Sequence, residues 1–346
     1  MIEPAGVAVK GRLGAAPAYR GRFAPSPTGP LHFGSLVAAV GSRLDALAHG
    51  GEWLLRMEDV DAPRNVPGAA EGILTTLEAY GFEWEGSVLR QSERLDAYQA
   101  ALDKLIRNRS ASRPGATLID PVSMRVSKRH AGQESRGQAY PCACSRREIA
   151  DSASHAAIDG GLAYPGTCRG GLPPGRPPRA WRLRVDNDEV AFLDRLQGRI
   201  SQHLETDVGD FVLLRADGQF AYQLAVVVDD AFQGITHVVR GADLLASTPR
   251  QIWLQRCLGV PTPTYVHLPV ATNGAGEKLS KQTLAPALDP DHPGPALIQA
   301  LQFLGQQPPV ELARAAPAEI WQWAQEHWNF EAVPRREKIP LPGEGA

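Results

Sequence analysis

The most informative segment of the chain reads RFAPSPTGPLHFGS and runs from Arg22 to Ser35. A short strand over residues 19–24 leads into a turn rich in proline and glycine, and apolar residues then recur at the spacing of a one-sided helix. The start of such a helix offers free backbone N–H groups and a positive dipole, which suit phosphate. Gly34 allows close approach of a ligand, and His32 can donate to a phosphate oxygen. We therefore expect a phosphate site here; the alternative is a proline-stiffened loop with a capping serine.

The residues after this helix extend the pattern to a βαβ unit. Gly50 and Gly51 close the helix, and a second strand is expected over residues 52–57. Strand, helix and strand in this order predict a parallel sheet with a right-handed crossover. Further strands are expected at 180–186, 209–215 and 236–240, and helices at 71–80 and 92–106, whereas residues 219–232 fit either state.

Composition limits the class of protein. The chain has 346 residues, 43% of them hydrophobic, and 36 Lys and Arg against 38 Asp and Glu. No apolar run approaches the roughly 20 residues that span a bilayer, and the N-terminus lacks the apolar core of a secretory signal. The 4 cysteines are too few for a disulfide framework. We expect a cytoplasmic α/β protein without membrane contact; the near-neutral charge neither indicates nor excludes a nucleic-acid partner.

Two lysines form a second candidate site. Lys278 and Lys281 lie in the segment KLSKQ, which ends at Gln282 and follows a glycine-containing stretch. Such a loop can close over a triphosphate and neutralise charge as pyrophosphate separates. For an isolated Lys-x-x-Lys, a solvated basic loop would be the better interpretation.

Three cysteines form a third candidate site. Cys142, Cys144 and Cys168 are close in sequence, whereas Cys257 lies far away in an expected helix. Structural zinc needs four tetrahedral ligands, so one more is required, and His155 is the chemically usual choice. Three unrelated buried thiols are the alternative.

The first two segments together resemble the paired signatures of class I aminoacyl-tRNA synthetases. Residues 22–29, Val228-Asp229-Asp230 and residues 235–244 are similar to the glutamyl branch of that family. The likeness runs from about residue 19 to residue 284, with a gap at 107–139. It implies a Rossmann-like catalytic domain that uses ATP with Mg²⁺, L-glutamate and tRNA. Gln282 departs from the serine that usually ends the lysine motif.

The resemblance implies a role for each matched position. The fixed cations Arg22 and Arg240 suit carboxylates, and Glu58 suits the ammonium group of glutamate. The implied glutamate site comprises Arg22, Phe23, Ala24, Pro25, Ser26, Glu58, Tyr222 and Arg240. The implied ATP site comprises His32, Gly34, Ser35, Lys278 and Lys281, with His32 and Lys281 as catalytic residues. The implied zinc ligands are Cys142, Cys144, Tyr164 and Cys168, with Tyr164 in place of His155.

The expected organisation follows the chain from end to end. Residues 107–139 carry seven basic and two acidic side chains and are interpreted as a disordered linker, with a phosphate-contacting arm as the alternative. The segments are a flexible lead (1–18), the first catalytic half (19–106), the insertion (107–139), a zinc-binding and tRNA-contacting segment (140–205), the second catalytic half (206–286) and a short helical region (287–346).

The length of the last segment favours one group within the glutamyl branch. About 60 residues follow the lysine loop, too few for a large anticodon-binding region, so the chain resembles the truncated paralogues. In that group glutamate is activated as its adenylate without tRNA and passed to the queuosine base at the wobble position of tRNA(Asp), whose anticodon stem-loop would lie near the zinc segment. A shortened enzyme that charges tRNA(Glu) and an inactive tRNA-binding paralogue are the alternatives. We expect a monomer.

Overall fold

The computed structural model describes residues 19–108, 137–152, 157–158, 161–273 and 286–341. Several sequence predictions fall outside these residues. They are the lead (1–18), most of the insertion (109–136), His155, Lys278 and Lys281.

The predicted βαβ unit is present and has nearly the predicted bounds. Strands β1 (Arg20–Phe23) and β2 (Glu52–Met57) are parallel, with Arg20 opposite Glu52 and Phe23 opposite Leu55. Helix α1 (Phe33–Ala48) connects them. A short strand, β3 (Leu89–Arg90), continues the parallel sheet beyond β2. An apolar stripe on α1 is fully buried, which explains why this helix packs on the sheet (Leu36, Val37, Val40, Leu44).

A second group of parallel strands adjoins the first. Strands β9 (His237–Gly241) and β10 (Thr264–Leu268) are parallel, and β6 (Glu189–Asp194) pairs with β10 on its other side. The Thr236 N–H donates to the Arg20 carbonyl at 3.0 Å, which holds the start of β9 beside β1. Strand β7 (Gly198–His203) is antiparallel to β6 at the outer edge, and α5 (Leu204–Asp207) follows it. The sequence reasoning missed this β6–β7 hairpin.

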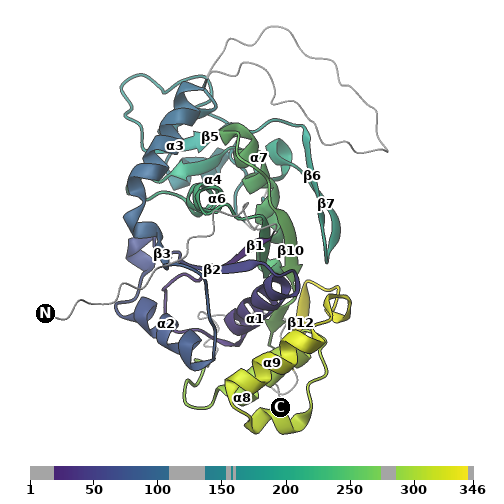
Figure 1. The fold of residues 1–346 in the computed structure, drawn as a ribbon. Coiled ribbons are helices and arrows are strands. Elements are labelled where there is room, and N and C mark those ends of the chain that lie inside the picture. The colour runs from purple at the N-terminus through teal and green to yellow at the C-terminus, as the bar shows by residue number, and fades with distance from the viewer. Residues whose placement is uncertain (1–18, 109–136, 153–156, 159–160, 274–285, 342–346) are drawn as a thin grey trace, which may run out of the picture.

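Helices cover the sheet and place side chains at its edge. Helices α2 (Ala69–Ala79) and α3 (Leu95–Arg107) correspond to the two predicted ones. The ambiguous segment 219–232 is helical as α6 (Tyr222–Phe232) and buries residues 224–227 without a break. A continuous buried run of this kind does not distinguish a helix from a strand. Helix α7 (Thr248–Leu258) follows β9 and packs near α3 and α6 (Figure 1).

A smaller antiparallel sheet carries the cysteines. It consists of β4 (Ala139–Cys142), β5 (Ala180–Leu183) and β8 (Phe211–Leu214), with α4 (Arg146–Ser152) beside it. The Gln138 N–H donates to the Asn108 carbonyl at 3.2 Å. The end of α3 and the start of β4 are therefore neighbours.

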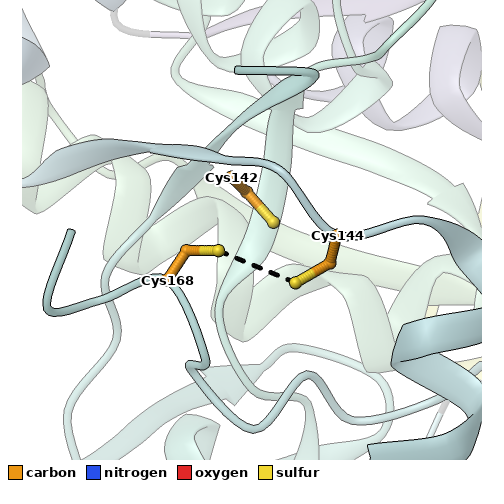
Figure 2. Close-up of side chains that lie close together, drawn as sticks. All are labelled: Cys142, Cys144 and Cys168. Atoms are coloured by element: carbon orange, nitrogen blue, oxygen red, sulfur yellow. Dashed lines mark hydrogen bonds between the residues drawn. The ribbon is translucent and has the colours of Figure 1, made fainter. Parts of the chain in front are cut away.

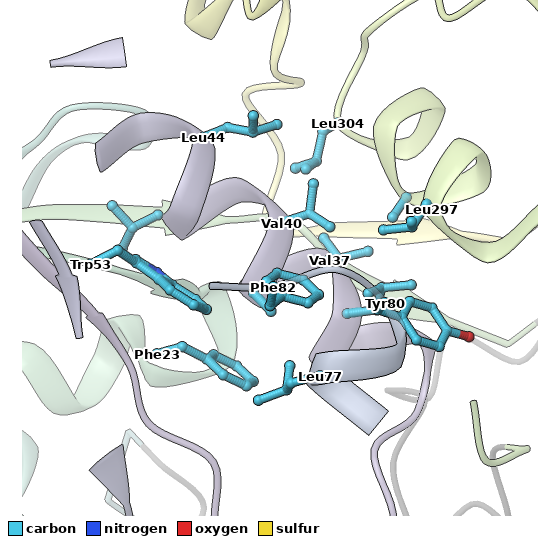
Figure 3. Close-up of a cluster of buried hydrophobic side chains, with 14 of the residues drawn as sticks. Phe23, Val37, Val40, Leu44, Trp53, Leu77, Tyr80, Phe82, Leu297 and Leu304 are labelled. Atoms are coloured by element: carbon cyan, nitrogen blue, oxygen red, sulfur yellow. The ribbon is translucent and has the colours of Figure 1, made fainter. Parts of the chain in front are cut away.

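The C-terminal helices pack against the first half of the sheet. Helices α8 (Pro293–Phe303) and α9 (Pro317–His327) lie next to α1 (Figure 1), and β11 (Val270–Thr272) pairs with β12 (Lys338–Pro340). Leu297 and Leu304 join Val37, Val40 and Leu44 in one core (Figure 3). In the described parts of the chain, no helix has both the length and the apolar character needed to cross a bilayer.

Candidate functional site

The predicted glutamate-site residues converge where the parallel strands end. Ser26 follows β1 and Glu58 follows β2, and the Glu58 N–H donates to the Pro25 carbonyl at 2.9 Å. Ser26, Glu58 and Tyr222, the first residue of α6, line one cavity of about 270 Å³. The carboxyl ends of parallel strands are the usual ligand-binding edge of open α/β sheets.

A buried ion cluster lies next to this cavity. Arg22 Nε and Arg56 Nη2 both contact Asp230 Oδ1, at 3.1 and 2.8 Å, and Arg56 Nη2 is 3.4 Å from Glu58 Oε1. Burial would raise the pKa of Asp230, but the two guanidinium groups outweigh it and lower the pKa. Asp230 is therefore an anion that fixes both arginines.

The charges of this cluster also act on Glu58 and Tyr222. Burial raises the pKa of Glu58, although the cations Arg56 and Arg22 oppose the rise. Burial and the nearby Glu58 raise the pKa of Tyr222 to about 12, so its hydroxyl keeps its proton at neutral pH. Glu58 shares the Arg56 guanidinium group with Asp230 and has the longer contact of the two, 3.4 Å against 2.8 Å, so a ligand ammonium group would give it a closer partner.

Arg240, in β9, is held on two sides. Its Nη2 donates to Thr248 Oγ1 and Gln251 Oε1, both at 2.8 Å, and its Nε donates to His267 Nε2 at 3.1 Å. Its remaining nitrogen, Nη1, is buried and has no hydrogen-bond partner among the described residues. A buried N–H group of this kind favours a ligand acceptor such as a carboxylate.

The other matched residues of the first segment surround the start of α1. His32 precedes the helix, its Nε2 is 3.3 Å from Ser35 Oγ, and Gly34 lies in the first turn. The Phe23 ring instead packs against Trp53 in the core, with 6.2 Å between ring centroids, so only its backbone can face a ligand.

Some residues of the cavity and its surroundings escaped sequence reasoning. Arg56 is a charged residue within the largely apolar strand β2, and its side chain is 0% exposed. A lone cation in such a strand signals a buried anion, which here is Asp230. Gln91 and Asp61 also line the cavity, and each keeps one buried oxygen, Oε1 and Oδ1, without a partner among the described residues. They follow no motif that would single them out.

The three predicted cysteine ligands meet at the end of β4, where Cys142 is the last residue of the strand. Their Sγ atoms lie within 4.8 Å of one another, and Figure 2 shows the thiols of Cys142, Cys144 and Cys168 turned toward a common point. The Tyr164 hydroxyl lies 3.3 Å from Cys142 Sγ and 3.5 Å from Cys144 Sγ, and it accepts the Cys168 N–H at 3.0 Å. Three thiols and one phenol oxygen at one point fit a tetrahedral zinc ion.

Comparisons with known proteins identify the family of the chain. Residues 18–314 match the family model described as tRNA synthetases class I (E and Q), catalytic domain. The Glutamyl-Q tRNA(Asp) synthetase of Dechloromonas aromatica is 67% identical over 94% of this chain and 98% of its own length. The protein of the same name from Aromatoleum aromaticum is 57% identical over 95% of each chain.

A solved structure shows the same fold. The crystal structure of glutamate-tRNA synthetase from Elizabethkingia anophelis superposes with a TM-score of 0.69 at 23% identity, covering 93% of this chain and 68% of that one. The chain belongs to the class I tRNA synthetases of the E and Q type and, within them, to the glutamyl-Q tRNA(Asp) synthetase family. It is accordingly a ligase of the aminoacyl-tRNA synthetase kind, as the sequence predicted.

Proposed function

We propose that the protein activates L-glutamate with ATP in the absence of tRNA and then transfers the glutamyl group to the queuosine base at the wobble position of tRNA(Asp). The names of the relatives support the second step. The first step is supported by the buried side chains Glu58 and Tyr222 and by Arg240, whose Nη1 has no hydrogen-bond partner within the part of the chain that the structure describes. We expect a monomer acting in the cytoplasm, where ATP and tRNA are available.

The chemistry requires no nucleophile from the protein. A carboxylate oxygen of glutamate attacks the α-phosphorus of ATP, the bond to pyrophosphate breaks, and glutamyl-adenylate forms. A nucleophilic group of the queuosine base then attacks the activated carbonyl, and AMP leaves with the bonding electrons. The protein contributes orientation and charge neutralisation.

Each side chain has a defined task in this proposal. Arg22 and Arg240 bind carboxylate oxygens, and Glu58 accepts the ammonium group. The Tyr222 and Ser26 hydroxyls and the backbone of residues 23–25 complete the glutamate site. His32, at the start of α1 with Gly34 and Ser35, faces the phosphates of ATP, and Lys278 and Lys281 neutralise the departing pyrophosphate. Mg²⁺ bound to ATP would add further neutralisation.

We also propose that Cys142, Cys144, Cys168 and Tyr164 hold a structural zinc ion. The contacts of the Tyr164 hydroxyl with two thiols support this oxygen as the fourth ligand. Zinc content measured after purification tests the assignment. Tyr164→Phe should lose most of the metal and His155→Ala should keep it; the reverse result would transfer the role to His155.

Two assays test the proposed reaction. Glutamate-dependent exchange of pyrophosphate into ATP should occur without tRNA, and its absence would leave the inactive tRNA-binding paralogue as the better interpretation. Labelled glutamate should then attach to tRNA(Asp) that carries queuosine and not to tRNA(Asp) that lacks it. Labelling of tRNA(Glu) instead would identify a shortened glutamyl-tRNA synthetase.

A further inference from the structure

Three buried residues form a row across neighbouring parallel strands. Asp194 ends β6, His267 lies in β10, and Arg240 lies in β9 directly opposite His267 in the strand register. Asp194 Oδ2 is 2.7 Å from His267 Nδ1, and His267 Nε2 is 3.1 Å from Arg240 Nε. A continuous chain of hydrogen bonds therefore connects the end of β6 to the Arg240 guanidinium group.

The partners of His267 determine where its proton lies. An arginine Nε–H can only donate, so His267 Nε2 must accept, and Nδ1 carries the proton that is donated to Asp194. The other Asp194 oxygen accepts the backbone N–H groups of Leu196 and Gln197, at 3.0 and 2.8 Å. Burial lowers the pKa of His267 to about 4, which leaves the imidazole neutral at pH 7. Asp194 thus keeps the imidazole in the tautomer that can bind Arg240.

The same network leaves one part of Arg240 free for a ligand. Nε is held by His267, and Nη2 is held by Thr248 and Gln251 from α7. These three contacts hold two of the three guanidinium nitrogens, and the third, Nη1, has no partner among the described residues. The orientation of Nη1 is therefore fixed before any ligand binds.

We propose that Asp194 and His267 are positioning residues that orient Arg240 to bind a carboxylate of glutamate. This inference rests on the proposed function, in which Arg240 contacts the amino-acid substrate. Without the contact at Nε the guanidinium group can rotate, and misplacement of a binding group by about 1 Å can cost roughly 100-fold. The loss of the contact should therefore weaken the binding of glutamate and leave the binding of ATP unchanged.

Two substitutions at His267 separate the hydrogen bond to Arg240 from general packing. The shorter amide of His267→Asn can still reach Asp194 but not Arg240, whereas the longer amide of His267→Gln can place an acceptor near the Nε2 position. We expect His267→Asn to raise the KM for glutamate in pyrophosphate exchange by about 10- to 100-fold, with the KM for ATP within about twofold. His267→Gln should recover most of this loss.

Asp194→Asn is the second variant, because it preserves side-chain volume. Its oxygen can still accept the Leu196 and Gln197 N–H groups, but its amide nitrogen would donate to His267 Nδ1. The proton would then move to Nε2 and face the Arg240 N–H, so the KM for glutamate should rise although the fold is retained. Tyr265→Phe is the matched control in the same strand, because it removes only the hydroxyl that Gln255 Nε2 bonds. The ring that packs against His267 and Arg240 stays in place, and no hydrogen bond of the Asp194–His267–Arg240 chain is lost.

Calorimetric binding of L-glutamate and thermal unfolding accompany the kinetics. The proposal is supported if His267→Asn and Asp194→Asn bind glutamate more weakly, His267→Gln recovers the binding, and Tyr265→Phe binds like wild type. This result would support the positioning role even if no exchange activity is detected. Absent exchange in the wild-type protein would overturn the proposed function alone. Unchanged glutamate affinity in folded Asp194→Asn, or an equal rise in KM for both substrates, would overturn the positioning role.

Discussion

At the scale of single residues, Asp230 holds the candidate site together. Its buried carboxylate lies between two guanidinium groups, and one oxygen contacts both Arg22 and Arg56. A buried pair of this kind gains little net stability over an apolar replacement, but loss of one partner leaves uncompensated charge. Replacement of Asp230 should therefore cost more stability than replacement of a surface acid.

We predict that Asp230→Asn lowers the free energy of unfolding by about 3–5 kcal/mol at pH 7, measured by urea denaturation. Because the pKa of folded Asp230 lies below its unfolded value, its contribution is present above pH of about 4 and is lost as pH falls through the folded pKa. The difference between wild type and variant should therefore shrink in acid. A difference that stays constant down to the acid transition would contradict a charge-based role.

Glu331→Gln provides the control for this measurement. Glu331 pairs with Arg335 at 2.7 Å, but its side chain is 73% exposed. An exposed ion pair contributes roughly 0.2–1 kcal/mol, so this variant should remain close to wild type. A large loss in both variants would indicate that any charge change destabilises the chain.

At the scale of secondary-structure elements, local pattern predicted the first half of the fold well. The residues between Pro25 and Gly34 predict the turn and the helix after β1, because their conformational preferences do not depend on distant contacts. The β6–β7 hairpin was missed although its register is local, because most of its side chains at the sheet edge are exposed or half-buried and leave only a weak apolar alternation. Arg56 was missed for a different reason, since its partner Asp230 is 174 residues away.

The bridge between Tyr164 and the residues just before β8 depends on a glycine. Gly209, just before β8, has a φ of +73° and forms an isolated bridge to Tyr164, and a Cβ there would lie 2.5 Å from the Tyr164 carbonyl oxygen. Gly198, at the start of β7, has a φ of +82° but open space around the Cβ position. Because both φ angles are positive, alanine would strain the backbone at either position. Only at Gly209 would the added Cβ also clash with Tyr164.

We predict that Gly198→Ala costs about 1–2 kcal/mol of unfolding free energy and that Gly209→Ala costs about 1–3 kcal/mol more. Gly209→Ala should also reduce zinc content after purification, because Tyr164 must move away from the thiols. Thermal unfolding and metal analysis of the two variants measure these effects. Equal destabilisation of both, with equal zinc content, would show that the close approach does not position Tyr164.

At the scale of the whole molecule, the C-terminal helices share one hydrophobic core with α1. Trp321, in α9, donates its Nε1–H to the Tyr80 carbonyl at 2.8 Å, across 241 residues of chain. The Arg43 guanidinium lies 4.2 Å above the Trp321 ring, and the Phe82 ring packs edge-on at 4.9 Å. Arg43 belongs to α1, the helix that begins at the candidate ATP site, so the C-terminal region supports the site through this helix.

We therefore predict that Trp321→Ala lowers the unfolding free energy by about 3–5 kcal/mol and that the chain still unfolds in one transition by calorimetry. The control is Trp323→Ala, since Trp323 is only partly buried and stacks on His327 within the same helix; it should cost clearly less. An early separate transition in Trp321→Ala, with unchanged melting of the remainder, would mean that α8 and α9 fold independently. A single transition at lower temperature is expected because α1 and α9 share one core, so loss of the Trp321 contacts weakens both the C-terminal helices and the scaffold beneath the ATP site.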